Sequence, residues 1–345
     1  RHVGLLRRIL ERGRGFQGIM CFTAEEASFL AGEGFDDLLV AYPTLQARAL
    51  DGLAQAAHTA TVWQIVDCAE HLDALGAAGR RAGLEMRAVL ELDVALRKGP
   101  LHVGARRSPI RTAAQALALA RHAQRVEGVR VAGLMGYEAH VAGLQDDTPF
   151  APALNPMKRA LKRVAMPAVL RLRQQVVAAL RAEGHALDLV NGGGTGSVRL
   201  TAADACVTEV TAGSGFVCSH LFDYFVDNLG VEPAAFFALE VCRVSDPGYV
   251  TCLGGGYVAS GEPGWDRLPL PWRPEGLRYV KIEGAGEVQT PLRVGGAAPA
   301  LGDPVIFRHA KAGELAERFG EYLVLSGGRV VGRAPTYRGQ GRCFL

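Results

Sequence analysis

The sequence has no apolar run approaching the roughly 18 residues that a membrane-spanning helix needs, and no signal-peptide pattern. It has seven cysteines, but no two are separated by only two residues, so neither a disulfide framework nor a cysteine zinc site is indicated. A reducing cytoplasm is the expected location. Excess charge of one sign is also lacking, since 38 basic residues face 35 acidic ones. We therefore expect neither nucleic acid nor a membrane surface as a partner.

What the chain does contain is enough apolar sequence for about two domains, with 345 residues of which 49% are hydrophobic. Up to about residue 230, short β-branched runs alternate with alanine- and leucine-rich helical stretches, which is typical of a parallel sheet with crossover helices. The expected strands cover 18–22, 37–42, 61–66, 85–92, 129–137, 186–191 and 206–212. The expected helices cover 23–32, 69–82, 110–127 and 156–183.

Seven such strands are compatible with an open doubly wound sheet or with a (β/α)8 barrel that lacks one strand. Along the strand 85–92, Glu85, Arg87, Glu91 and Asp93 share one face by the period of two. A parallel strand in an open sheet is normally apolar on both faces, whereas a barrel carries charges inside its catalytic mouth. We therefore favour the barrel. Residues 1–12 resemble the helix after a first strand, so we expect that strand to precede Arg1 and to be missing.

After residue 230 the pattern changes to short strands such as "GYVTCLGGGYVAS" and "DPVIFRHA", separated by Gly, Pro and Asp turns. Helical periodicity remains only at 312–318. This pattern predicts a second, mostly antiparallel β domain. The expected domains are a barrel over residues 1–230 and a β domain over residues 231–345.

The stretch "LVNGGGTGSV" (189–198) places four glycines and two hydroxyl side chains directly after a predicted strand. It matches neither a Walker loop nor the GxGxxG dinucleotide fingerprint. Bare backbone amides with Thr195 and Ser197 at the carboxyl end of a late barrel strand are typical of phosphate capture. A glycine-rich turn without a ligand is the alternative. A second loop of this type, "TAGSGF" (211–216), follows the next strand and favours the phosphate interpretation.

The strand end "GLMGYEAH" presents Tyr137 and His140 where a barrel displays catalytic groups. By themselves these residue types are more often packing or surface residues. Asp67 and Glu209, which close or occupy other strands, are interpreted as structural anchors for neighbouring loops.

These motifs together resemble fold-type III pyridoxal-phosphate enzymes of the D-threonine aldolase and D-serine dehydratase branch, and most closely the amino acid deaminase/aldolase type. The resemblance covers nearly the whole chain. Its segments are "FTAEEASFLAGEGFDDLLVAYPT", "LELDVALRKG", "VGARRSPIRT", "GLMGYEAHVAG", "VNGGGTGS", "VTEVTAGSG", "GDPVIFRHAKAGE" and "APTYRGQGRCFL".

The resemblance implies a barrel of the alanine racemase N-terminal type that holds pyridoxal 5′-phosphate, with a D-serine dehydratase-like β domain after it. Tyr137 would lie in the pocket wall near the pyridine ring. The cofactor phosphate would be held by two sets of loop residues, namely Gly193, Gly194, Thr195, Gly196 and Ser197, and Gly213, Ser214 and Gly215.

The sequence departs from this family in two places. These enzymes bind the cofactor's aldehyde through a lysine at the end of the first barrel strand, and none of the five lysines here occupies that place. We therefore expect a chain truncated before Arg1, without that lysine and inactive by itself. Relatives also carry a metal pair, His-x-Cys or His-x-Asp, where this chain has His309-Ala310-Lys311. A protonated lysine cannot ligate a metal, so a divalent ion at His309 is doubtful.

The implied activity is that of a lyase on small β-hydroxy D-amino acids such as D-threonine or D-serine, by aldol cleavage or by dehydration and deamination. His140 and His309 are the acid–base candidates because histidine titrates near neutral pH. Lys311 is a candidate for the metal's electrostatic role. Arg106 or Arg107 would grip the substrate carboxylate. The alternatives are an amino-acid racemase with the same cofactor and a phosphate-binding barrel enzyme without it. A homodimer is the expected assembly.

Overall fold

The computed structural model describes residues 1–13, 15–227 and 230–344. The chain forms two compact units. The sheet unit contains Val3–Leu144 and Arg159–Ala212, together with Cys343 and Phe344. The β unit contains Arg1–His2, Gln145–Lys158 and Gly213–Arg342. The units are described separately, and the expected domain boundary at residue 230 stays a prediction.

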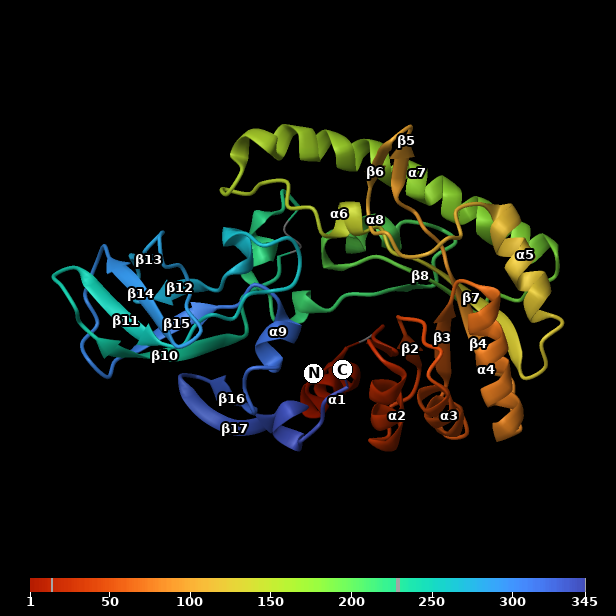
Figure 1. Cartoon of the computed structure of the whole chain (residues 1–345), viewed down its shortest axis with the longest axis horizontal. Helices are drawn as coiled ribbons and strands as arrows, with labels where there is room; N and C mark the ends of the chain where they lie inside the picture. The colour runs from red at the N-terminus through yellow and green to blue at the C-terminus, as the bar shows by residue number, and fades with distance from the viewer. Residues whose placement is uncertain (14, 228–229, 345) are drawn as a thin grey trace. The chain divides into compact units, whose positions relative to one another are not determined.

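The sheet unit is built on a curled, seven-stranded parallel sheet in which neighbours in sequence are neighbours in space (Figure 1). This order is that of a barrel wall, because a doubly wound sheet reverses its strand order at a switch point. All seven predicted strands are present, and the predicted barrel-like fold is confirmed. The strands are β1 (Ile19–Cys21), β2 (Leu38–Val40), β3 (Val62–Val66), β4 (Met86–Glu91), β7 (Val129–Gly136), β8 (Leu189–Gly192) and β9 (Glu209–Val210).

The crossover helices follow the predicted pattern, and α4 and α5 pack against β4 and β7 (Figure 1). Helix α3 and the hairpin of β5 (Leu96–Lys98) and β6 (Leu101–Val103) were not predicted. Helix α3 buries Ala49, Leu50 and Leu53, a helical spacing that the sequence does carry. The helices are α1 (Val3–Arg12), α2 (Ala24–Gly32), α3 (Ala47–Ala56), α4 (Ala69–Ala82), α5 (Ala113–Ala123), α6 (Ala139–Ala142), α7 (Asn155–Ala182) and α8 (Val198–Ala202).

Strand register explains why one end of the sheet is polar. Glu91, Met135, Asn191 and Glu209 are paired in sequence across β4, β7, β8 and β9, so their side chains lie in one row on one face. Deeper along the strands, the same face is apolar. Glu91, Asn191 and Glu209 therefore gather at the carboxyl ends, as expected for a barrel mouth, whereas Arg87 lies over Trp63 near the other end of β4. The apolar cluster on this face consists of Leu39, Ala41, Trp63, Ile65, Val89, Ala132, Leu189 and Met135, the apolar member of the row itself.

The β unit contains a six-stranded antiparallel sheet in the order β12-β15-β10-β11-β14-β13. The Tyr279 hydroxyl in β13 donates to the Pro269 carbonyl just before β12 at 2.6 Å, which draws the two outer strands toward closure. Phe237 and Phe307 stack in the core, 5.2 Å between ring centroids. The second, mostly antiparallel β region is thus confirmed. Its strands are β10 (Phe236–Arg243), β11 (Tyr249–Leu253), β12 (Leu270–Arg273), β13 (Leu277–Tyr279), β14 (Gln289–Val294) and β15 (Pro304–Arg308), beside a β16 (Glu321–Ser326)–β17 (Arg329–Pro335) hairpin and α9 (Ala312–Ala316).

Candidate functional site

Glu91 is the most perturbed carboxyl group at the carboxyl edge of the parallel sheet. It is 5% exposed at the end of β4. Burial raises the pKa of Glu91 from its usual 4.5 to about 7; the Arg107 guanidinium opposes this rise, and the carboxylates of Asp67 and Asp93 add to it. A carboxyl group that titrates near neutral pH can give or take a proton under working conditions.

The raised pKa of Glu91 predicts a pH-dependent stability. Between pH 4.5 and about 7 the unfolded chain releases this proton while the folded chain keeps it, so the free energy of unfolding should fall as pH rises. This rise in the pKa of Glu91 corresponds to about 3 kcal/mol. Glu91→Gln should flatten this part of the profile, as measured by urea unfolding at several pH values. An unchanged slope in that variant would place the titration on another group.

Arg107 lies against two aromatic rings in the loop after β6. Its guanidinium carbon is 5.5 Å from the centroid of Tyr42 and 5.2 Å from that of Tyr137, so one cation contacts residues that follow β2 and β7. Arg107 is nevertheless exposed, and so is Arg106. Of the two predicted carboxylate-binding arginines, Arg107 is therefore the one held at the site.

His140 lies in α6, directly after β7, and is 6% exposed. Neither of its ring nitrogens has a hydrogen-bond partner among the described residues. Burial lowers the pKa of His140, although Glu138 and Asp93 partly oppose this effect. A neutral, buried imidazole with two unused nitrogens is unusual, because buried polar atoms are normally paired. His140 therefore has hydrogen-bonding capacity that the described residues do not use.

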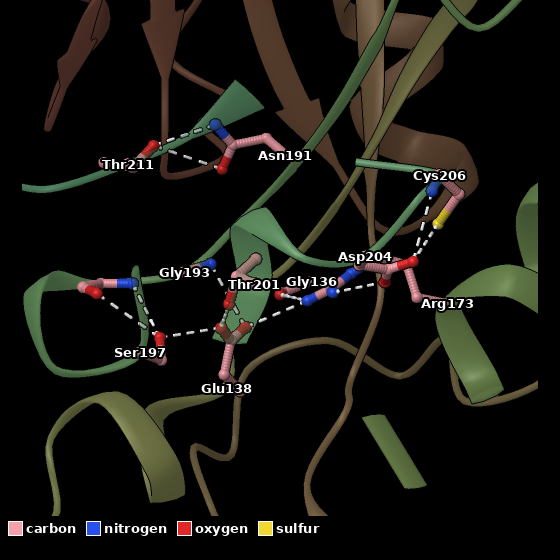
Figure 2. A network of polar contacts seen from close by, with 11 residues as sticks. Gly136, Glu138, Arg173, Asn191, Gly193, Ser197, Thr201, Asp204, Cys206 and Thr211 are labelled. Carbon is pink, nitrogen blue, oxygen red and sulfur yellow. Dashed lines mark hydrogen bonds and ion pairs between the residues drawn. The ribbon is translucent and has the colours of Figure 1, made fainter. Parts of the chain in front are cut away.

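Glu138 holds the glycine-rich loop in place through its carboxylate, which is fully buried (Figure 2). One oxygen accepts hydrogen bonds from the Ser197 hydroxyl at 2.9 Å and from the Thr201 hydroxyl. The other oxygen accepts from the Gly193 amide at 3.2 Å. The Gly194 amide donates to Ser197 Oγ at 3.1 Å. Several donors that the sequence assigns to a phosphate are therefore satisfied inside the chain, and their role toward a ligand stays a prediction.

Arg173 connects this loop to the long helix α7 (Figure 2). Its guanidinium is fully buried and donates to Glu138 Oε2 at 3.1 Å and Asp204 Oδ2 at 3.0 Å. It also donates to the Gly136 carbonyl at 2.9 Å. Burial acts to raise the pKa of Asp204, but hydrogen bonds from Gln174 and Arg173 outweigh it, so that pKa is lowered. The two carboxylates share one cation.

The glycines of the loop are explained by close packing. A side chain at Gly192 would lie 2.7 Å from the Arg173 guanidinium. Gly193 has φ +85°, a conformation that disfavours other residues, and a side chain there would meet Val210 at 2.6 Å. A side chain at Gly194 would approach the Tyr137 ring to 3.1 Å. The loop is therefore fixed against both the buried arginine and the predicted cofactor-wall tyrosine.

A cavity of about 420 Å³ opens at the carboxyl ends of β1 and β2. It is lined by Tyr42, by Phe22 and Glu25 at the start of α2, and by Cys343 and Phe344. Phe344 packs on Phe22 with ring centroids 6.4 Å apart. Tyr42 joins this cavity to the Arg107 contact, so both belong to the same edge of the sheet.

The remaining predicted site residues lie in the β unit. Gly213, Ser214 and Gly215 lead into and form a short 3-10 turn. His309 is buried, and its Nδ1 lies 3.0 Å from the Ala235 carbonyl, which can only accept; Nδ1 therefore carries the proton. Its Nε2 has no partner among the described residues, and burial lowers the pKa of His309 to about 4. Lys311 donates to Ser260 Oγ at 3.1 Å.

Glu138 and Arg173 were missed by the sequence reasoning, although a signal for Arg173 exists. Arg173 shares one helical face with Val169, Val176 and Leu180, all of which are buried. An arginine on an otherwise apolar helix face indicates a buried ion pair, because an unpaired charge there is too costly. For Glu138 the sequence offers only its place at a strand end.

Comparison with known proteins agrees with this architecture. Residues 2–218 match the family described as "Alanine racemase, N-terminal domain". The chain is 30% identical over 200 residues to a D-threonine aldolase of Arthrobacter sp., an alignment covering 58% of this chain and 47% of the relative. It is 26% identical over 287 residues to a 3-hydroxy-D-aspartate aldolase of Paracoccus denitrificans (strain Pd 1222), covering 80% and 67%. The chain thus spans about half of the first relative and two thirds of the second.

Two solved structures share the fold. A D-threonine aldolase from Filomicrobium marinum superposes with a TM-score of 0.83 at 22% identity, covering 98% of this chain and 85% of that one. A D-threo-3-hydroxyaspartate dehydratase from Delftia sp. HT23 gives 0.73 at 22% identity, covering 97% and 86%. The resemblance found in the sequence motifs is confirmed. Because the family match covers more than half of its length, the chain belongs to the alanine racemase N-terminal-domain family.

Proposed function

We propose that the chain is the catalytic body of a pyridoxal-phosphate-dependent lyase that acts on small β-hydroxy D-amino acids. The observation that carries the proposal is His140, buried in α6 directly after β7, with no hydrogen-bond partner for either ring nitrogen among the described residues. The family is pyridoxal-phosphate-dependent, and the relatives are named as aldolases or a dehydratase of such amino acids.

The residues at the sheet's carboxyl edge fit a phosphorylated aromatic cofactor. The loop around Thr195 and Gly196 would face the phosphate, and Glu138 would keep that loop in shape. Tyr137, which packs against Gly194, would form the ring wall. When bound, pyridoxal phosphate condenses with an amino group and serves as the electron sink for the bond that breaks at Cα. Gly213, Ser214 and Gly215 are kept as a second phosphate loop of the β unit.

The chain's own groups would position the substrate and move its protons. Arg107 would bind the substrate carboxylate, and its contacts with Tyr42 and Tyr137 restrict where the guanidinium lies. The lowered pKa keeps His140 neutral near pH 7, so its free lone pair can accept a proton. Removal of the β-hydroxyl proton leads to aldol cleavage, and removal of the α-proton leads to loss of the hydroxyl. The same base can serve either outcome.

Of the two metal ligands expected from the resemblance, only His309 is present. His309 offers a buried lone pair on Nε2, which suits a metal. The residue two positions on is Lys311, whose ammonium donates to Ser260 and cannot ligate while protonated. Burial and Arg267 lower the pKa of Lys311. The residues present do not fit the family's metal pair, and we propose no step through it; His309 and Lys311 remain candidates for acid–base and electrostatic roles.

None of the five lysines follows a strand of the parallel sheet. Lys98 lies in β5, Lys158 and Lys162 lie in α7, and Lys281 and Lys311 belong to the β unit. We therefore propose that this chain holds the cofactor without a covalent bond to lysine and turns over slowly or not at all.

No helix in the described part of the chain has both the length and the apolar character needed to cross a bilayer. A homodimer remains our proposed assembly.

The test combines binding with a single-turnover assay. Pyridoxal 5′-phosphate should bind stoichiometrically and more tightly than pyridoxal, and borohydride treatment should leave the mass of the chain unchanged. With D-threonine, glycine and acetaldehyde would indicate aldol cleavage, whereas 2-oxobutyrate would indicate dehydration. A product that is only L-amino acid would favour the racemase instead. Equal affinity for pyridoxal and its phosphate would contradict the phosphate loop and, with it, this function.

A further inference from the structure

Asp67, Cys68 and His71 bring three different metal-ligating atoms together at the carboxyl end of β3. A carboxylate oxygen, the thiol sulfur and an imidazole nitrogen all lie within 4.8 Å of one another. Asp67 and Cys68 form the turn between β3 and α4, and His71 is in the first turn of that helix. The side chains of Asp67 and His71 are 13% and 17% exposed, so the group is sheltered but open to solvent.

The needs of helix α4 do not explain this group. Cys68 is the N-cap residue, with extended backbone at φ −145° and ψ 170°, yet its side chain makes no capping hydrogen bond. Ser, Thr, Asp or Asn normally take this position because their oxygens accept from the helix amides. A thiol is a weak acceptor, so Cys68, which faces the His71 amide, caps α4 less well than those residues would.

Asp67 and His71 already bring their ligating atoms together. The Asp67 amide lies 3.4 Å from His71 Nδ1, which is a long contact for a hydrogen bond. The same Nδ1 lies 3.0 Å from Asp67 Oδ1. A proton on Nδ1 makes this contact a hydrogen bond, and a metal ion that takes its place on binding would release that proton to solvent. The thiol of Cys68 is directly beside them.

We propose that Asp67, Cys68 and His71 form a binding site for one divalent zinc-class ion, with the remaining coordination position held by water. Zinc accepts carboxylate oxygen, thiolate sulfur and imidazole nitrogen in one site, and three protein ligands with one open position are typical of its non-structural sites. On binding, the Cys68 thiol releases its proton to solvent and the sulfur donates an electron pair to the ion. The proposal does not depend on pyridoxal phosphate.

The ion would lie at the same edge of the sheet as Glu91. Asp67 is close enough for its charge to act on the Glu91 carboxyl group. A dication on Asp67 would reverse the sign of that local charge and favour the ionised form of Glu91. Zinc binding would therefore change the protonation of Glu91, even though Glu91 is not one of its ligands.

The test is a metal titration of the full chain after treatment with a chelator. Competition with a chromophoric chelator should give one Zn²⁺ per chain, and Co²⁺ in its place should produce a thiolate-to-cobalt charge-transfer band. Cys68→Ser should abolish that band and, like His71→Ala, weaken Zn²⁺ binding by more than about 100-fold, beyond what losing an outer-shell partner costs. Circular dichroism of the variants shows whether they fold, which we expect for Cys68→Ser because serine is itself a preferred N-cap residue.

Two control variants change the same residue types outside the proposed zinc site. His122→Ala removes another His–Asp contact involving helix α4, that of His122 Nε2 with Asp73 at 2.7 Å. Cys343→Ser removes an exposed thiol of the sheet unit. Both should retain the ion and the band. Absence of stoichiometric binding, or a band that survives in Cys68→Ser, would overturn the proposal.

Discussion

Replacing Arg173 by methionine is expected to destabilise the sheet unit by about 3–5 kcal/mol, the usual cost of removing one partner from a buried ion pair. The substitution leaves the carboxylates of Glu138 and Asp204 inside the protein without their shared cation. It also removes the donor to the Gly136 carbonyl at the end of β7. Arg173→Lys should recover only part of the loss, because one ammonium replaces a planar group with several fixed donors.

Urea unfolding with hydrogen exchange measured on β8 peptides separates this effect from changes in the β unit. Arg121→Met is the matched control, since Arg121 pairs with Glu183 on the surface. Exposed pairs of this kind contribute little to stability, because solvent and salt screen them. A loss in Arg173→Met as small as that of the control would mean that the buried charges relax into other contacts.

The sequence was sufficient for the sheet because its signals are local. Each parallel strand is a short apolar run, and the period of two already placed Glu91 and Asp93 on one face. The long-range contacts were not accessible in this way. Glu138 and Arg173 are 35 positions apart, and the local sequence around either residue does not predict that the two form an ion pair. The glycine loop was correctly recognised as special, but the sequence could not show that many of its donors are used internally.

The same limit applies to the two loop sets and to the arginine pair. Arg106 and Arg107 are equivalent in sequence, and only the placement of Tyr42 and Tyr137 separates them. Gly193 and Gly213 stand in similar motifs, yet Gly193 has a positive φ whereas Gly213 has φ −125° and open space around its α-carbon. Glycine is therefore required at Gly193 but not at Gly213. The similar sequences of the two loops do not reveal this difference.

Glu138→Gln is expected to lower the affinity for pyridoxal 5′-phosphate by about 10- to 100-fold while affecting pyridoxal much less. In the native chain one carboxylate oxygen accepts from two hydroxyls, and the other accepts from the Gly193 amide and Arg173. An amide group pairs less well, because it removes the negative charge beside the buried Arg173 guanidinium and its NH2 forces the Ser197 and Thr201 hydroxyls to accept instead of donate. Each such mismatch is worth about 1–3 kcal/mol, which corresponds to a displaced loop and weaker phosphate binding.

The ratio of the two affinities distinguishes this role from a merely structural one. Glu26→Gln is the matched control, because Glu26 is also a buried carboxylate that accepts a backbone amide, that of Phe22 at 2.7 Å, but lies in α2. It should lower stability and leave the ratio unchanged. Equilibrium dialysis with both ligands provides the measurement. If Glu138→Gln instead lowers stability and keeps the native ratio of the affinities for pyridoxal 5′-phosphate and pyridoxal, the loop does not bind the phosphate. In that case the hydrogen bonds of Ser197 and Gly194 serve only the internal structure of the loop.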